Sequence, residues 1–390
     1  MSSSTVVTGG NGKDALPDGS PNPGANVGFY KYTDDQEDTD TKEERATNYG
    51  YGSGAANVNI YGGRVHRVFG GSNTKGNVRI VAVTMLDNEN NDCEFIVDEA
   101  YGGGKSAPMD GAANLIMACI PGLKAAYGGA EEANINGDVK LTITNGNFDR
   151  VFGGNNVSGT ITGKIEVNIE ETGCKPIIIG QLYGGGNQAR YDGPENEGPT
   201  LNVRSFTSIG DIFGGGYGKT AIVAGNTTVN ISVTEGRYST PESSISTWLD
   251  DKLGDRTISF TEYIRDDDTG DFVLDTDGNR TTETKNIAVF LPTHDDGKIG
   301  AINNVYGGGN AAEVDGSTTV NIGTLEYVEI TSVAVGEDVT GYYTCTVGGE
   351  GTEESPYTYT YTAATGKAVD GTTYYKAVTG VDIRGNVYGG

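Results

Sequence analysis

The sequence has little histidine, tryptophan or cysteine, and each shortage narrows the chemistry that the chain can carry. Its 390 residues include two histidines, one tryptophan and four cysteines. Cys93, Cys119, Cys174 and Cys345 form no C-x-x-C pair, so they indicate neither a zinc site nor a dense disulfide framework. The redox state of these cysteines stays open at this level.

Positive charge is also scarce. Lys and Arg number 27 against 53 Asp and Glu, which gives a net charge of −26. Such a surface repels phosphate backbones and anionic lipids. We therefore expect no nucleic-acid partner and no direct membrane insertion, whereas glycans and host or cell-surface proteins are suitable partners.

Long apolar runs and helical periodicity are absent. The longest apolar run, "LIMACI" at 115–120, ends at Pro121 and is far shorter than the roughly 18–20 residues of a membrane-spanning helix. The N-terminal "MSSSTVVTGG" lacks the basic start and apolar core of a secretion signal. No segment repeats its apolar residues at helical spacing, so we expect little helix.

Glycine is abundant, and its positions are regular. The chain contains 62 glycines, about 16%, against a usual share of about 7%. An aromatic residue precedes Gly-Gly nine times, mostly at spacings of 25–32 residues. The nine aromatics are Tyr61, Phe69, Tyr101, Tyr127, Phe152, Tyr183, Phe213, Tyr306 and Tyr388. A repeat of this length indicates a stacked array of similar units.

Each unit reads as an apolar-aromatic pair, a glycine corner, a short strand, a second corner and an alternating strand, which makes two or three short strands. "VFGGNNVSGTITGKIEVNI" (151–169) aligns with "IFGGGYGKTAIVAGNTTVNI" (212–231) and "VYGGGNAAEVDGSTTVNI" (305–322). The final strand alternates apolar and polar residues, as a half-buried strand does. Stacking in register places valines and isoleucines inside and Asn168, Asn230 and Asn321 outside. The fold class expected is all-β: an elongated parallel β-solenoid, right-handed β-helix-like, with two inserted β-hairpin subdomains.

The glycine pairs suit the corners of such a fold for two reasons. Glycine accepts positive φ, and it lets successive coils pack closely.

The repeats resemble the glycine-rich [FY]GG regions of large bacterial, Bacteroidetes-type surface and adhesin-like proteins. The residues that carry the resemblance are "VFGGNN", "LYGGGNQA", "VYGGGNAAEV" and "NIEETGCKPIII" (168–179). It covers 50–235, 299–325 and the last few residues. The resemblance implies extracellular β-helices, mostly without assigned activity, and hence an extracellular or cell-surface location.

The organisation expected along the chain has six parts. They are a flexible acidic lead-in (1–48), solenoid repeats (49–236), a β-rich insertion (237–298), a further repeat (299–325), a Tyr/Thr-rich β insertion (326–380) and the start of another repeat (381–390). Because "NVYGG" stops within a unit, we expect the chain to be a piece of a longer one.

The aromatic before each glycine pair is a candidate carbohydrate-binding group. Along an extended strand, the aromatic and the aliphatic residue before it point to opposite faces. If the aliphatic residue faces the core, Tyr183, Phe213 and Tyr306 form an exposed ladder that can stack on sugar rings. If the aromatic faces inward, it forms a column in the core, which the interchange of Phe and Tyr favours.

Calcium is the one candidate ion, and no other cofactor is expected. "RDDDTGDFVLDTDGNR" (265–280) gathers Asp266, Asp268, Asp275 and Asp277, and oxygen-rich clusters attract Ca²⁺. The spacing does not match an EF-hand, and two hairpin turns explain the same residues better. "GGNGKDALP" (9–17) matches one calcium-binding nonapeptide, but no second copy follows.

Catalysis is not expected, although β-helices include polysaccharide lyases and hydrolases. His294, Asp295 and Asp296 stand together in "THDDGK" (293–298), but without the Gly-His-Gly or Arg-x-Lys partner of pectin-degrading families. The function expected is a non-catalytic extracellular structural or adhesive scaffold. The alternatives are a carbohydrate-binding module and, second, a β-helix polysaccharide lyase or hydrolase.

Overall fold

The fold contains strands, turns and bends but no helix among the residues that the structure describes. This computed structural model describes residues 4–7, 27, 55–87, 94–172, 175–233, 252–293, 300–323, 327–331, 333–349, 357–377 and 380–390. None of these segments contains a helix long and apolar enough to cross a membrane. The expectation of an all-β chain is confirmed.

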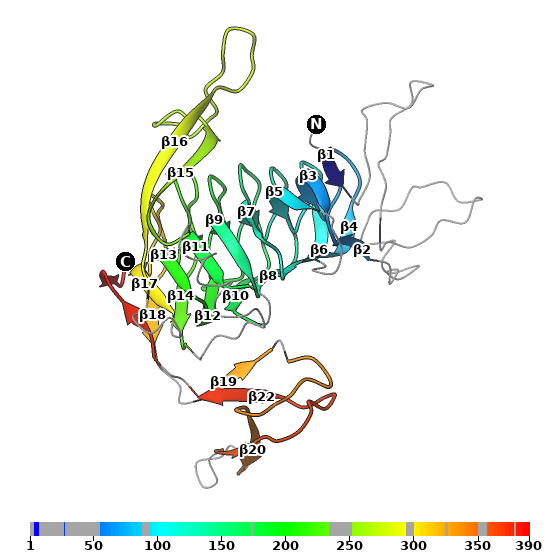
Figure 1. The fold of residues 1–390 in the computed structure, drawn as a ribbon. Coiled ribbons are helices and arrows are strands. Elements are labelled where there is room, and N and C mark those ends of the chain that lie inside the picture. The colour runs from blue at the N-terminus through cyan, green and yellow to red at the C-terminus, as the bar shows by residue number, and fades with distance from the viewer. Residues whose placement is uncertain are drawn as a thin grey trace, which may run out of the picture.

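Two long parallel sheets make up the body of the molecule (Figure 1). The first has ten strands: β1 (Ser4–Val7), β3 (Gly63–Phe69), β5 (Phe95–Tyr101), β7 (Gly122–Tyr127), β9 (Gly146–Phe152), β11 (Ile177–Tyr183), β13 (Ser208–Phe213), β17 (Ala301–Tyr306), β23 (Asp382–Ile383) and β24 (Val387–Tyr388). The second has eight: β2 (Ala56–Ile60), β4 (Val78–Leu86), β6 (Met109–Ala118), β8 (Val139–Ile143), β10 (Ile165–Glu170), β12 (Thr200–Ser205), β14 (Thr227–Ile231) and β18 (Thr318–Ile322).

The chain passes from one sheet to the other and back in each unit. From β2 to β14, every odd-numbered strand lies in the first sheet and every even-numbered strand in the second. A third row of single parallel bridges joins the corners, as in Met109 to Ile135 and Ile135 to Ile161. Residues 4–7 and Val27 also take part, by pairing with β3 and Val78, which differs from the flexible lead-in expected there.

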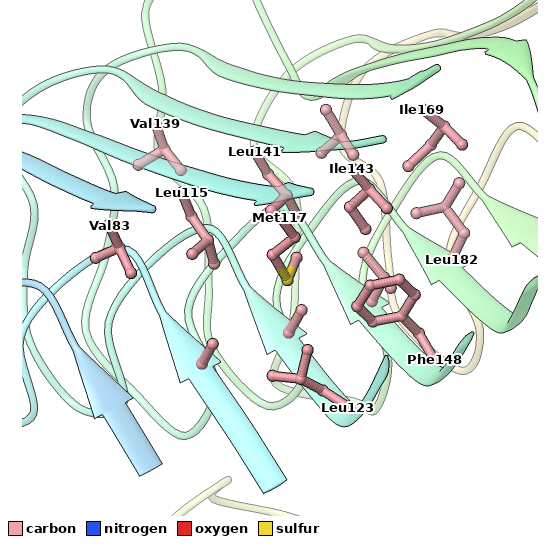
Figure 2. Packing of buried hydrophobic residues seen from close by; sticks show 14 of the residues in the cluster. Val83, Leu115, Met117, Leu123, Val139, Leu141, Ile143, Phe148, Ile169 and Leu182 are labelled. Atoms are coloured by element: carbon pink, nitrogen blue, oxygen red, sulfur yellow. The ribbon is translucent and has the colours of Figure 1, made fainter. Parts of the chain in front are cut away.

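The hydrophobic core lies between the two sheets and extends along their length (Figure 2). In the second sheet, Val229 and Ile231 are fully buried while Asn230 between them is half-buried, as alternation predicts. Register is preserved from unit to unit, so that Val167, Leu201, Val229 and Val320 pair in succession. Each unit thus continues the core of its neighbour.

An asparagine column lies on the outer face of the second sheet. Asn202 donates to the side-chain oxygen of Asn168 at 3.1 Å, Asn230 to Asn202 at 3.0 Å and Asn321 to Asn230 at 2.9 Å. The in-register position expected for Asn168, Asn230 and Asn321 is confirmed, and Asn202 belongs to the same column.

The glycine pairs form two columns at the corners. The N–H of Gly153 donates to the carbonyl of Tyr183 at 2.9 Å, and the N–H of Gly154 donates to that of Gly185 at 3.0 Å. A Cβ on Gly153 would lie 2.3 Å from the carbonyl oxygen of Gly184. Close packing therefore explains these glycines, whereas the positive φ also expected for them is wrong, because none of the pairs from Gly70 to Gly308 adopts it.

Two further sheets lie outside this body. β15 (Gly254–Tyr263) and β16 (Thr282–Leu291) form an antiparallel hairpin. β19 (Tyr327–Ile330), β20 (Tyr343–Gly348), β21 (Thr358–Ala363) and β22 (Tyr374–Ala377) form a four-stranded sheet in the order β19-β22-β20-β21. The second is more than a hairpin, because Ile330, Val339, Tyr342, Ala368 and Tyr374 give it a small core of its own.

Cysteines occur in two states among the described residues. Cys119 is disulfide-bonded and Cys345 is a free, half-buried thiol. Cys93 and Cys174 lie outside the described residues.

Replacing Gly153 with alanine should destabilise the fold. The new methyl would lie 2.3 Å from the backbone oxygen of Gly184, so we expect a loss of about 1–3 kcal/mol in the free energy of unfolding, measured in urea. Gly389 occupies the same place in the last unit and has no atom within 4 Å of the corresponding position. Gly389→Ala is the matched control and should change stability by less than about 0.5 kcal/mol; equal effects at both sites would contradict the packing explanation.

Glu171 should make stability depend on pH. Burial raises the pKa of its carboxyl from 4.5 to about 7, although Ile177 N–H and Thr207 Oγ1 donate to it. The folded state therefore holds a proton that the unfolded state releases, and stability falls as pH rises from about 4.5 to about 7, by roughly 3 kcal/mol.

Glu171→Gln removes this titration and keeps an acceptor oxygen. The stability difference between variant and wild type should therefore grow from about pH 5 to pH 8 in urea unfolding. Glu195→Gln, at an exposed position, removes the same charge and serves as control. A difference for Glu171→Gln that stays constant over this range would show that the carboxyl is not the source.

Candidate functional site

The aromatic residues of the glycine corners form one continuous stack along the first sheet. Adjacent rings lie 4.6–5.1 Å apart between centroids and within 4–12° of parallel. The stack runs through Phe69, Tyr101, Tyr127, Phe152, Tyr183, Phe213, Tyr306 and Tyr388. Each ring face within it is therefore covered by a neighbouring ring.

This stack matches neither arrangement expected from the sequence. The aliphatic neighbours, such as Leu182, belong to the main core, so the rings point away from it. Yet Tyr183 and Phe213 are only 0% and 6% exposed, and Tyr306 is half-buried. An exposed ladder at Tyr183 and Phe213 is therefore wrong: the rings pack in a second apolar cluster outside the sheet.

Neighbouring turns cover the rings. The side-chain amide of Asn310 donates to the Tyr183 hydroxyl at 3.1 Å, and the ring of Tyr217 meets that of Tyr183 edge-on, with centroids 5.9 Å apart. Tyr388, the last ring of the stack, is 44% exposed.

Arg150 lies buried in an aromatic cage at the centre of the stack. Its guanidinium carbon is 3.7 Å from the ring centroid of Phe260, 4.5 Å from that of Tyr217 and 4.6 Å from that of Phe152. Because Phe260 belongs to β15, the cage joins the hairpin to the outer face of the first sheet. A cation over several desolvated rings is stabilised by their quadrupoles.

A chain of hydrogen bonds leads from Arg150 along the stack. Arg150 donates to the Asn187 side-chain oxygen at 3.0 Å, and Asn187 donates to that of Asn156 at 2.9 Å. Asn156 donates to the Tyr101 hydroxyl at 2.8 Å, and Tyr101 donates to Glu99 at 3.0 Å. Of these polar groups, Glu99, Asn156 and Asn187 line the space between the sheet and the hairpin.

A polar cleft of about 210 Å³ lies at that place. We call it the hairpin cleft. One wall is the outer face of the first sheet with its corner turns, and the other is the hairpin. Its lining residues are His66, Arg67, Glu99, Glu131, Asn156, Val157, Asn187, Gln188, Thr261, Glu262, Tyr263 and Thr282.

Two carboxyls of the hairpin cleft are unusual. Glu131 is 7% exposed and pairs with Arg67 at 2.5 Å; burial raises its pKa although Arg67 opposes the rise. Burial also raises the pKa of Glu262, against the nearby charge of Lys285 at 3.6 Å. Both carboxyls are thus poorly solvated without full compensation by a cation.

The four aspartates proposed for calcium lie in two tight turns of the hairpin tip. Asp266 accepts from the N–H groups of Asp268 and Thr269 at 3.0 and 2.8 Å. Asp275 accepts from those of Asp277 and Asn279 at 2.9 and 2.8 Å. These backbone donors lower the pKa of Asp266 and Asp275 and explain both residues as turn formers.

The described part of the chain has no group of three or more His, Cys, Asp or Glu side chains placed to hold a metal ion. The turn hydrogen bonds explain Asp266 and Asp275, and calcium binding by Asp266, Asp268, Asp275 and Asp277 stays a prediction. The nonapeptide at 9–17 and the group of His294, Asp295 and Asp296 lie outside the described residues.

The hairpin cleft was not foreseen from the sequence. Glu131 follows a glycine corner and Glu262 lies on the inserted hairpin, 131 positions later. The sequence offered only a general indication of this site, since insertions in repeat arrays often lie on the binding face.

Comparison with known proteins adds no relative: no family model, curated protein or solved structure matches the chain.

Replacing Arg150 with alanine should loosen the hairpin. The change empties the aromatic cage, so we expect a loss of about 2–4 kcal/mol in the free energy of unfolding and faster proteolysis within 254–291. Arg190→Ala, which removes an exposed pair with Asp192, is the control and should cost less than about 1 kcal/mol. A cage variant as stable and as protease-resistant as the control would show that Arg150 does not fasten the hairpin.

Proposed function

We propose that the two parallel sheets form a right-handed β-solenoid that serves as a non-catalytic extracellular scaffold. The observation that carries the proposal is the repetition of identical contacts from unit to unit. Glycine and aromatic columns bond or stack along most of the body, and an asparagine column continues through β10, β12, β14 and β18. Such arrays are stiff because every unit is held by its two neighbours.

The disulfide at Cys119 supports an extracellular location. Disulfides persist in oxidising compartments and are rare in the cytosol. The acidic surface supports the scaffold role, because a large net charge keeps an elongated molecule soluble.

The adhesive part of the proposal rests on the four-stranded sheet. The sheet and its connections expose Tyr357 and Tyr359, each by more than half of its surface, together with Val335, Val347 and Val369. Exposed apolar and aromatic groups gathered on a displayed subdomain are typical of interaction surfaces. We therefore propose that this sheet contacts glycans or host or cell-surface proteins.

Removing the exposed tyrosines should abolish adhesion without unfolding the chain. Tyr357→Ser combined with Tyr359→Ser should lower the binding of protein-coated beads to host cells at least tenfold, because the rings supply the contact area. Tyr61→Ser combined with Tyr388→Ser removes two exposed tyrosines from the solenoid and is the control. Equal binding by both double variants, or no binding by the intact chain, would contradict the adhesive role.

A further inference from the structure

Three buried polar atoms at the hairpin cleft make no hydrogen bond within the described structure. They are Oε2 of Glu131, Oε2 of Glu262 and Nε of Arg67. Leaving such an atom unsatisfied costs its full desolvation penalty, so a native protein rarely keeps several in one place without a reason. All three residues line the hairpin cleft, and Glu131 is more than nine-tenths buried.

The donor or acceptor character of these atoms determines which ligand could satisfy their hydrogen bonds. Two are acceptors and one is a donor, so the occupant must donate twice and accept once. Sulfate and chloride have no hydrogen to donate, hydrogenphosphate is repelled by the two carboxylates, and a metal ion cannot accept from Arg67. A sugar ring carries several hydroxyl groups that each donate and accept, as water does, so one ligand can serve both the carboxylates and the guanidinium.

The remaining walls fit the same occupant. Thr261 and Thr282 add hydroxyls from the hairpin, and Gln188 and Asn187 add amides from the corner turns. The cleft volume of about 210 Å³ lies below the roughly 300–1,000 Å³ of sites for drug-sized ligands, which limits it to about one ring.

We propose that the hairpin cleft binds one neutral sugar ring of a glycan, with Glu131, Glu262 and Arg67 as the hydrogen-bonding groups. Uronic and sialic acids are rejected because Glu99 adds a third carboxyl to the cleft of a strongly acidic protein. This site differs from the aromatic stack, whose rings are already occupied by one another.

The binding site is independent of the scaffold and of the tyrosine-rich sheet. If the chain adheres to cells but binds no sugar in the hairpin cleft, the proposed function holds and only this inference is refuted. Conversely, sugar binding that survives loss of Tyr357 and Tyr359 would separate the two surfaces.

The test mixes the full chain with a panel of methyl glycosides. Saturation-transfer NMR detects which of them bind. The panel contains neutral hexosides, N-acetylhexosaminides and their uronic and sialic counterparts. We expect at least one neutral glycoside to bind saturably, with a Kd on the order of 1 mM, as a single ring with few contacts would.

Glu262→Ala should weaken that binding at least tenfold, because it deletes an acceptor without touching the buried Glu131–Arg67 pair. Glu283→Ala removes the same charge from an exposed position on the same hairpin, outside the cleft, and should leave binding unchanged. Unfolding curves of both variants establish that the fold is intact.

Three results would each overturn the proposal. They are no binding by any neutral glycoside, equal binding by Glu262→Ala and wild type, and preference for an acidic sugar over its neutral counterpart.

Discussion

The structure depends on the distance at which one unit can approach the next at its glycine corners. The first glycine of each pair donates to the carbonyl of the next aromatic, and its missing side chain leaves the space that the next backbone fills. Strands of a sheet lie about 4.7–4.9 Å apart, and a Cβ at these corners is incompatible with that spacing. Backbone contact at the corners therefore sets the distance between units, independently of the side chains.

The same spacing explains the columns of like side chains. Rings held about one strand apart can only stack face to face, and asparagines at that spacing can bond amide to amide. The aromatic residues are therefore used for cohesion. Although the rings point away from the main core, they are not accessible to a ligand, because the turns and the hairpin cover them.

The hairpin packs against the sheet at a position where a glycine has no side chain. Ile258 of β15 packs 2.5 Å from where a Cβ on Gly180 would lie, so any side chain there would push the hairpin away. Arg256 adds a charge-assisted hydrogen bond to Asp149 at 2.6 Å. Together with the cage around Arg150, these contacts hold the hairpin over the sheet and create the hairpin cleft.

Much of the fold could be predicted from the sequence, and little of the candidate site could be. Alternation in "TTVNISV" and the spacing of the glycine pairs predicted the strands, their register and the asparagine column, because these features depend on local sequence. Glu131 and Glu262 line one cleft, and Arg150 contacts Phe260, only because an insertion folds back over earlier units. No local sequence pattern encodes such contacts. The facing of Tyr183 could not be settled either, since it depends on what covers the sheet.

Hydrogen exchange at the corner glycines tests the central claim most directly. If backbone contact at the corners sets the repeat, the N–H groups of Gly102, Gly153 and Gly184 should exchange as slowly as those in the middle of β9 and β11. They would then open only when the body unfolds as a whole. Rapid exchange at these glycines, with the strands still protected, would show that the corners are loose connections and that the side-chain columns alone hold the units together.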